Sequence, residues 1–281
     1  MAKKKKSEKL QGAMGFETYY RQLFGIRWEK LKNALLQESK PEPWQTSSNN
    51  PPYYLDSASV LAASSLPLEN AEKILDMCAA PGGKTLVISS FMNENATLVA
   101  NERSKERMMR LKRVADEFMI PSVRERVQIT CGDGAKLCLN KQEYYDSILL
   151  DAPCSSERHV LTSPAYLNEW SPARIKTLAI TQWSLLSSAY RLLKRGGYLV
   201  YATCALSPLE NDKIVERLEK KFKDVQYFSE IEWNNEKITK YFSGKLPIPE
   251  KTDYGFHVLP DTACGAGPLY FSVIYKKTID E

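Results

Sequence analysis

Histidine is scarce in this sequence, and no zinc-binding spacing of cysteine and histidine occurs. The 281 residues include two histidines and six cysteines, without a CxxC pair or an HExxH segment. Structural and catalytic zinc sites are normally built from such spacings, so we expect no metal site. We also expect reduced thiols, as in cytosolic proteins. By default, three of the cysteines are interpreted as small buried apolar residues: Cys131, Cys138 and Cys264.

Long apolar runs are also missing. None reaches the roughly 18 residues that a membrane-spanning helix requires. The lysines at the start of the chain are not followed by the apolar segment of a secretory signal. The sequence therefore predicts a cytoplasmic location and no membrane partner.

The positive charge is concentrated at one end and says little about a ligand. The net charge is +5, and residues 1–9 contain five lysines and one glutamate, which leaves 34 basic and 33 acidic groups elsewhere. A lysine tail can attract phosphates in a salt-sensitive way, but it can equally serve as a solubilising tail. The charge alone therefore decides neither for nor against nucleic acid.

The spacing of apolar residues divides the chain into three parts. Residues 16–36 have helical spacing with a break at Gly25, and residues 40–52 are rich in proline, serine and asparagine. We predict a basic disordered tail over residues 1–15, a helical extension and linker over 16–52, and one large α/β domain over 53–281.

Strands and helices alternate through the large domain. Strands are predicted at 74–77, 98–101, 127–130, 147–151, 198–203, 225–228 and 269–275, with a turn at 265–268. Helices are predicted at 56–65, 84–91, 104–119, 174–193 and 209–222. This alternation is typical of βαβ units, and it predicts a mostly parallel, twisted sheet.

Two of these strands run directly into a cysteine. The strand at 147–151 is followed by Ala-Pro-Cys154, and the strand at 198–203 is followed by Cys204. Ligands bind beyond the carboxyl ends of the strands in an open parallel sheet. If the two strands are neighbours, Cys154 and Cys204 face the same pocket.

The loop after the first strand has the residues of a nucleotide-binding turn without matching two common types. A P-loop needs a glycine where Cys78 stands, and the GxGxxG fingerprint of dinucleotide sites is absent. S-adenosylmethionine fits better because it carries no phosphate and requires only a close approach of the backbone. Small residues allow that approach: Ala79, Ala80, Gly82 and Gly83.

Acidic residues follow the next two strands. Glu102 stands where a carboxylate would receive ribose hydroxyl groups, and Asp133 stands where the adenine would lie. Taken singly, each acid is more often a turn or cap residue than a ligand. Together with the small-residue loop, they favour a nucleoside cofactor.

The blocks DMCAAPGGKT, DAPCSS and YATCALSPLEN resemble the signature blocks of the Sun/Fmu-type RNA (cytosine-5) methyltransferases. The similarity runs from about Tyr53 to the end of the chain. Residues 151–159 and 267–271 are most similar to the short members that act on small-subunit ribosomal RNA, including the mitochondrial-type enzyme.

This resemblance implies the fold, the cofactor and the partners. The implied fold is α/β, a class I (Rossmann-like) methyltransferase fold whose mostly parallel seven-stranded sheet has an antiparallel C-terminal strand. The implied methyl donor is S-adenosyl-L-methionine, and the implied partner is RNA, with ribosomal RNA favoured over transfer RNA. A ribosomal or accessory protein is a further expected partner, because the RNA-binding appendages of longer relatives are not found in this sequence.

The resemblance also implies roles for individual residues. Cys204 corresponds to the nucleophile, Cys154 to the cysteine that helps to release the product, and Asp151 to the carboxylate that contacts the base near N3. The corresponding cofactor-binding residues are Cys78, Ala79, Ala80, Pro81, Gly82, Gly83, Lys84, Glu102, Arg107, Asp133, Gly134 and Asp151. Arg158 and His159 follow the Pro-Cys block and are expected near the pocket, with a structural or RNA-contact role favoured over that of a general base.

Two other interpretations stay open. The chain can instead be a transfer-RNA cytosine-5 methyltransferase, from which the sequence does not separate it. It can also be a catalytically idle protein of RNA binding or ribosome assembly, although the presence of both cysteines argues against that interpretation.

Overall fold

A nine-stranded mixed sheet forms the centre of the computed structural model, which describes residues 10–231 and 235–279. The strand order is β5-β4-β3-β6-β7-β11-β10-β9, and β8 pairs with β11. The first five of these strands are parallel: β5 (Val127–Cys131), β4 (Thr97–Glu102), β3 (Lys73–Asp76), β6 (Tyr145–Asp151) and β7 (Leu193–Thr203). All five strands that alternation predicts in this region are present.

The remaining strands are antiparallel: β8 (Val225–Tyr227), β9 (Glu250–Lys251), β10 (Phe256–Val258) and β11 (Leu269–Lys276). The predicted α/β class with an antiparallel C-terminal strand is confirmed, but the predicted number of seven strands is wrong. The sheet has β9 and β10 in addition. Strands of two and three residues are too short to produce a recognisable alternation of apolar residues.

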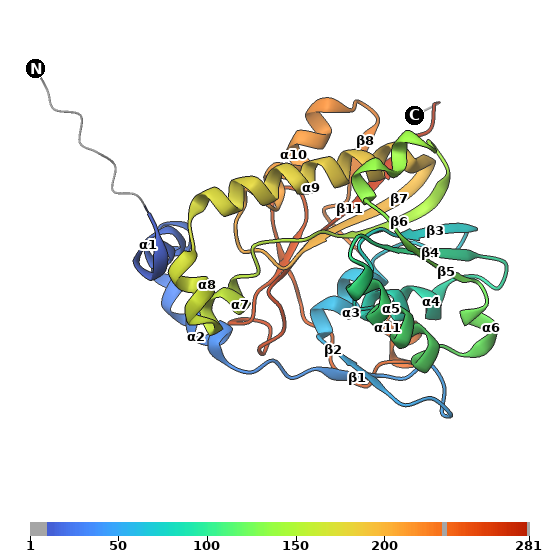
Figure 1. The fold of residues 1–281 in the computed structure, drawn as a ribbon, viewed down its shortest axis with the longest axis horizontal. Coiled ribbons are helices and arrows are strands. Elements are labelled where there is room, and N and C mark those ends of the chain that lie inside the picture. The colour runs from blue at the N-terminus through green and yellow to red at the C-terminus, as the bar shows by residue number, and fades with distance from the viewer. Residues whose placement is uncertain (1–9, 232–234, 280–281) are drawn as a thin grey trace, which may run out of the picture.

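Helices cover both faces of the sheet (Figure 1). One face packs against α9 (Pro172–Leu192) and α10 (Asp212–Lys221), and the other packs against α3 (Ser57–Ser64), α4 (Gly83–Phe91) and α5 (Lys105–Phe118). The shorter helices are α6 (Pro121–Arg124), η2 (Gly134–Leu139), α7 (Glu157–Thr162), α8 (Pro164–Glu169) and α11 (Asn235–Thr239).

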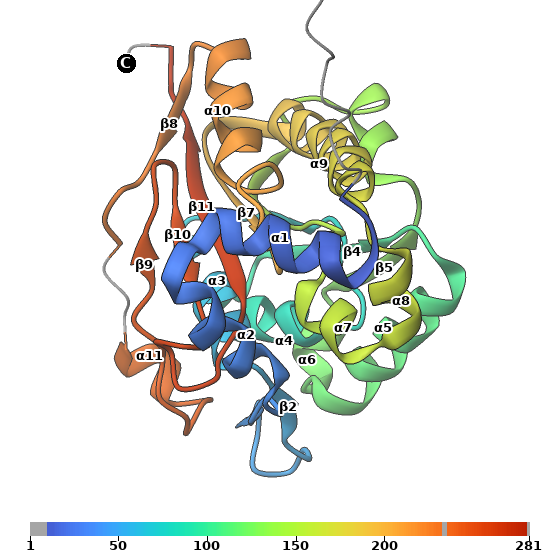
Figure 2. The same ribbon diagram turned by 90° about the vertical axis from the view of Figure 1, so that its left-hand side faces the viewer.

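The N-terminal extension packs at the end of the sheet where β6 and β7 finish. It consists of α1 (Gly12–Phe24), η1 (Gly25–Arg27) and α2 (Trp28–Leu36), so the predicted break at Gly25 is confirmed. Figures 1 and 2 show α1 and α2 beside α7 and α8. Aromatic and leucine side chains of the two helices are buried against Trp170 and Ile175.

The predicted tail boundary at residue 15 is too late. The helix α1 begins at Gly12, whose N–H donates to the carbonyl oxygen of Trp170 over 2.8 Å. This tertiary hydrogen bond fixes the start of the helix, and the local composition gives no sign of it. Residues 1–9 of the predicted tail lie outside the described residues.

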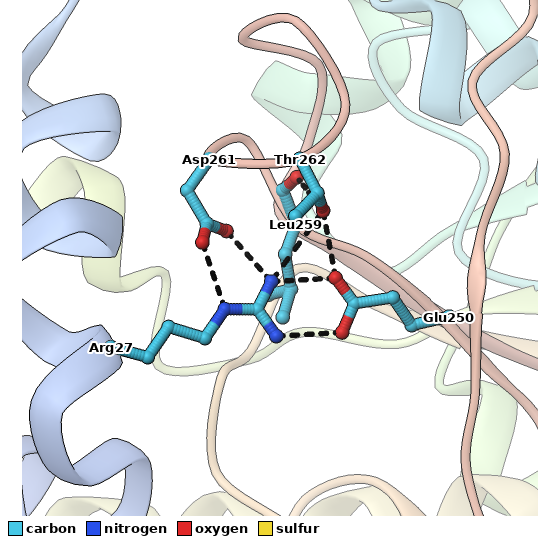
Figure 3. Close-up of polar contacts among 5 residues, drawn as sticks. All are labelled: Arg27, Glu250, Leu259, Asp261 and Thr262. Carbon is cyan, nitrogen blue, oxygen red and sulfur yellow. Dashed lines mark hydrogen bonds and ion pairs between the residues drawn. The ribbon is translucent and has the colours of Figure 1, made fainter.

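Arg27 attaches the extension to the antiparallel part of the sheet (Figure 3). Its guanidinium group donates to both oxygens of Asp261, over 2.8 and 2.9 Å, and to both oxygens of Glu250, over 2.7 and 2.5 Å. Thr262 donates to Glu250 over 2.7 Å. These carboxylates raise the pKa of Arg27 further above its ordinary value. Two forked ion pairs on one guanidinium fix orientation as well as distance.

The predicted linker over residues 40–52 is partly a strand. Residues Glu42–Trp44 form β1, which pairs antiparallel with β2 (Tyr53–Leu55). The Trp44 ring is buried and stacks on Tyr241, which lies 197 positions later in the numbering. The polar residues around Trp44 predict a linker, and the contact that buries Trp44 comes from a residue too distant in the sequence to be predicted locally.

The burial of three cysteines was also wrongly predicted. Cys131 and Cys264 are exposed, and Cys138 is only half-buried. Cys131 ends the edge strand β5, and Cys264 lies in a surface loop. At both positions the side chain remains accessible to solvent. In the described part of the chain, no helix is long and apolar enough to cross a membrane.

Candidate active site

A cavity of about 1250 Å³ lies at the carboxyl ends of the parallel strands. It reaches from Asp133 after β5 to Cys204 after β7. Open α/β sheets bind their ligands at this edge. Cys154, Cys204 and the two predicted acidic residues all line it.

Cys154 and Cys204 lie in direct contact inside this cavity. The two strands before them, β6 and β7, are parallel neighbours, with Asp151 opposite Ala202. The Sγ atoms are 2.6 Å apart. The expectation that both thiols face one pocket from adjacent strand ends is therefore confirmed.

Ser156 is a third polar group at this thiol pair (Cys154 and Cys204). Its Oγ lies 3.3 Å from Cys204 Sγ and 3.6 Å from Cys154 Sγ. Its backbone is left-handed, with φ 57° and ψ 59°, which is a costly conformation for a residue with a side chain. We did not single out Ser156 from the sequence, although it belongs to the DAPCSS block.

The two sulfur atoms differ in their electrostatic environment. The hydrogen bond to Cys204, and then burial, raise the pKa of the Cys154 thiol well above its ordinary value. Cys154 therefore keeps its proton and can donate it to the sulfur of Cys204.

Lys84 and Asp151 form an ion pair beside the thiols, with Nζ 2.8 Å from Oδ2. Burial alone would lower the pKa of Lys84, but the carboxylate of Asp151 and the nearby Cys204 raise it overall. Lys84 thus remains charged, neutralises Asp151 and contributes positive potential at Cys204. Sequence reasoning placed both residues in the site but not their direct contact.

Glu102 and Arg107 lie on the opposite side of the cavity. Glu102 is buried, and its Oε1 accepts from the N–H of Ser104 over 3.0 Å. Its Oε2 lies 3.1 Å from Arg107 Nη1 without accepting a hydrogen bond from the described residues. Arg107 also donates to the carbonyl oxygen of Ala80 over 2.7 Å. A buried carboxylate oxygen with spare acceptor capacity fits the hydroxyl groups of a ribose, as S-adenosylmethionine requires.

Asp133 and Gly134 line the same cavity beyond β5. Asp133 accepts from the N–H of Ala135 over 3.1 Å, so it also caps the short helix η2. Gly134 packs against Met77 and Leu185, and a Cβ there would lie 2.8 Å from Met77. Asp133 therefore caps a helix, in addition to the adenine contact that the sequence predicts for it.

The residues of the small-residue loop divide between two cavities. Cys78, Ala80, Pro81 and Lys84 line the main cavity and also a neighbouring one of about 120 Å³, whereas Ala79 and Gly83 line the smaller cavity alone. Burial raises the pKa of the Cys78 thiol, so that thiol is neutral.

Gly82 lines neither cavity. Its φ is +120°, and a Cβ there would lie 2.9 Å from Val114 of α5. Glycine at this position permits the turn and the close packing of α5, which is a different reason from the cofactor approach that we expected.

One wall of the cavity comes from the N-terminal extension, and local sequence gives no sign of it. Residues 35–39 line the cavity. Arg158 holds this wall by donating to the carbonyl oxygens of Gln37, Gly265 and Gly267 over 2.8, 3.0 and 2.7 Å. Its expected structural role agrees with these contacts. His159 also lines the cavity and lies against the ring of Tyr166.

Comparison with known proteins places these features in a family context. Residues 63–262 match the family described as 16S rRNA methyltransferase RsmB/F. The chain is 32% identical over 232 residues to the 5-cytosine rRNA methyltransferase NSUN4 of Bos taurus, covering 80% of this chain and 60% of that protein. It is 37% identical over 229 residues to the ribosomal RNA small subunit methyltransferase F of Pectobacterium atrosepticum, covering 80% and 44%.

A solved structure supports the fold. A methyltransferase homolog protein from Pyrococcus horikoshii superposes with a TM-score of 0.71 at 21% identity, covering 96% of both chains. The fold is therefore that of the class I methyltransferases. The chain spans 60% or less of the length of the two curated relatives above.

Proposed function

Because the chain belongs to the 16S rRNA methyltransferase RsmB/F family, we propose that it methylates carbon 5 of a cytosine in RNA, with ribosomal RNA as the favoured substrate. S-adenosylmethionine is the cofactor of this family. The observation that carries the proposal is the contact of two thiols, 2.6 Å apart, in a cavity that also contains the buried carboxylate of Glu102. That carboxylate can accept the hydroxyl groups of a ribose. Residues 53–281 form the proposed methyltransferase domain.

The reaction explains why a thiol is needed. Carbon 5 of cytosine is a poor nucleophile, but addition of a thiolate to carbon 6 converts the ring into an enamine whose carbon 5 can accept a methyl group. Such covalent catalysis divides one difficult step into two easier ones. When bound, S-adenosylmethionine supplies the methyl group from a sulfonium, which leaves as a neutral thioether. The proton on carbon 5 then leaves to a base, the carbon–sulfur bond breaks, and the thiolate is regenerated.

We assign the nucleophile to Cys204 and assistance in product release to Cys154. The retained proton of Cys154 supports this division, because only a deprotonated sulfur can add to carbon 6. Ser156 can donate a second hydrogen bond to the Cys204 thiolate from 3.3 Å. After methyl transfer, the Cys154 thiol is close enough to the carbon–sulfur bond to assist its cleavage.

Asp151 is proposed to contact the base near N3 and stabilise charge that develops on the ring. Its ion pair with Lys84 over 2.8 Å holds the carboxylate at the edge of the cavity. Glu102, Arg107 and the loop over residues 78–84 are proposed to hold the cofactor on the other side.

The target cytosine has to leave any helical stack, because carbon 6 is shielded there. RNA sequence is also read mainly in single-stranded loops. We propose a ribosomal or accessory protein as a further partner of the chain.

Two measurements test the proposal. Bisulfite sequencing of total RNA from a deletion strain should reveal one cytosine in ribosomal RNA that loses its methyl group. A loss in transfer RNA instead would establish the alternative substrate. Isothermal titration of the purified chain should show binding of S-adenosylmethionine, and no binding together with unchanged RNA methylation would support an idle RNA-binding protein.

A further inference from the structure

Two buried glutamates, Glu157 and Glu210, meet behind the thiol pair. Both have 0% of their surface exposed. The hydroxyl group of Ser155 lies between them, in contact with Glu157 Oε1 and with Glu210 Oε2. In the described part of the chain, neither carboxyl group takes part in an ion pair with lysine or arginine. We call these three residues the carboxyl network.

The other partners of the network are all donors. Glu157 Oε1 also accepts from the hydroxyl group of Tyr20, and Glu157 Oε2 accepts from the N–H of Leu206 over 3.0 Å. Glu210 Oε1 accepts from the N–H of Ser155 and from Gln182, each over 2.9 Å. Glu210 Oε2 has Ser155 Oγ as its hydrogen-bond partner among the described residues.

A count of hydrogens then leaves one contact unexplained. A serine hydroxyl group carries one hydrogen, so it can donate to one of the two carboxyl oxygens but not to both. If Ser155 donates to Glu157, the contact with Glu210 Oε2 requires a proton on that oxygen. We propose that Glu210 is a neutral carboxylic acid whose Oε2 donates to Ser155, and that Glu157 is the carboxylate, so that one shared proton holds the network together.

Charge supports this assignment. Two carboxylates that share one hydroxyl group without a cation would repel each other in a buried environment. Burial raises the pKa of both carboxyl groups, and burial followed by the charge of Glu157 raises that of Glu210 to about 7. The hydrogen bonds favour Glu157 as the carboxylate, because Tyr20 and the N–H of Leu206 donate to its two oxygens. The other titratable groups that face the pair are Tyr19 and Tyr20 of α1, Tyr201 of β7 and Cys154, and all four are neutral.

The network connects the two loops that carry the thiols. Ser155 directly follows Cys154, and Leu206 stands two residues after Cys204. Each loop is held by a backbone N–H that donates to the pair. We therefore assign Glu157 and Glu210 as positioning residues for the thiol pair. The importance of that position rests on the proposed function, but the shared proton can be measured without RNA or cofactor.

Infrared difference spectroscopy at pH 6 tests the proton directly. Exposed carboxyl groups are ionised at this pH. The spectrum of the wild-type chain minus that of Glu210→Gln should contain the carbonyl band of a protonated acid. Glu216→Gln is the matched control, because Glu216 lies on nearby α10 and lysines lower its pKa to about 2; its difference spectrum should contain carboxylate bands alone. If the difference spectrum of Glu210→Gln contains carboxylate bands and no band of a protonated acid, the proposal is overturned.

A second variant keeps the test decisive if Glu210→Gln does not fold. In Glu157→Gln, an amide N–H can donate to Ser155, which then donates to an ionised Glu210. The acid band should therefore be lost from this variant too. Its persistence would overturn the assignment of one shared proton.

Hydrogen exchange tests the positioning role. The backbone N–H groups of Ser155 and Leu206 should lose protection in the wild-type chain as pH rises from 6 to 9, after correction for intrinsic exchange. Glu210→Gln places an amide donor where the acid proton was. The two backbone N–H groups should therefore stay protected from exchange at every pH in Glu210→Gln. In Glu210→Ala they should lose protection at every pH. Equal pH dependence in Glu210→Gln and the wild-type chain would show that the proton does not hold these loops.

Discussion

The sulfur atoms of Cys154 and Cys204 lie 2.6 Å apart although 50 positions separate them in the sequence. The parallel pairing of β6 and β7 produces this contact, since each strand ends immediately before its cysteine loop. The thiols are not equivalent, because the pKa of Cys154 is raised by its hydrogen bond to Cys204. Different consequences are therefore expected when each cysteine is removed.

Removal of Cys204 should abolish methyl transfer while leaving cofactor binding intact. Without the thiolate, carbon 5 stays unactivated, and we expect a loss of roughly 10⁴-fold or more in rate. Transfer of labelled methyl from S-adenosylmethionine to RNA by Cys204→Ala, together with isothermal titration, measures both properties. Cys131→Ala is the control because Cys131 is exposed at the end of β5. Near-normal turnover in Cys204→Ala would remove it from the nucleophile role.

Removal of Cys154 should instead trap the RNA on the protein. Cys204 can still add to the base in Cys154→Ala, but release is slow, so a covalent adduct accumulates. The adduct is measured as a shifted band on a denaturing gel. The double variant Cys154→Ala/Cys204→Ala should show no such band, and an absent band in the single variant would contradict the release role.

Lys84→Met should weaken both stability and cofactor binding. The substitution keeps most of the side-chain volume but leaves Asp151 without its partner at 2.8 Å. An uncompensated carboxylate in a largely buried place costs about 1–3 kcal/mol of unfolding free energy. Denaturant unfolding and titration with S-adenosylmethionine measure the two effects. If Lys84→Met binds the cofactor as tightly as the wild-type chain, the ion pair is not part of the cofactor site.

Arg27→Leu should loosen the N-terminal extension. Arg27 holds Glu250 and Asp261 at once, and the side chain of Asp261 is 1% exposed. Because Arg27 itself is about one-third exposed, we expect a loss of about 1–2 kcal/mol after allowance for solvent screening. Hydrogen exchange should increase in residues 28–39, which include the cavity wall.

Arg21→Leu is the matched control for this prediction. Arg21 lies on α1 and pairs with Glu17 and Glu29 at the surface, where ion pairs contribute little. Equal effects of the two substitutions on the cavity wall would contradict a specific attachment through Arg27.

Stability should fall with rising pH in a way that Glu210→Gln removes. The pKa of Glu210 is about 7 in the folded chain, against 4.5 as its ordinary value. Between these values the folded chain holds a proton that the unfolded chain has lost, so the contribution is complete below pH 4.5 and disappears as pH rises through 7. Urea unfolding at several pH values measures the slope. An unchanged slope in Glu210→Gln would show that Glu210 does not titrate in this range; Asp76, also raised to about 7, contributes equally to both chains.

The sequence by itself determined the alternation of strands and helices and the place of the site. Local periodicity is sufficient to predict β3, β4, β5, β6 and β7, because each is an apolar strand followed by a helix or a loop. Parallel strands bring their carboxyl ends to one edge, so the sequence alone predicts that Cys154, Cys204 and Glu102 share one pocket. The signature blocks then indicated the chemistry.

Only the tertiary structure decided which distant residues complete that pocket. The wall over residues 35–39, the attachment of Arg27 to Asp261 and the carboxyl network of Glu157, Ser155 and Glu210 join segments with no shared local pattern. The same holds for the short strands β9 and β10. Periodicity reports which face of one segment is buried, whereas the partner of that face depends on how the whole chain folds.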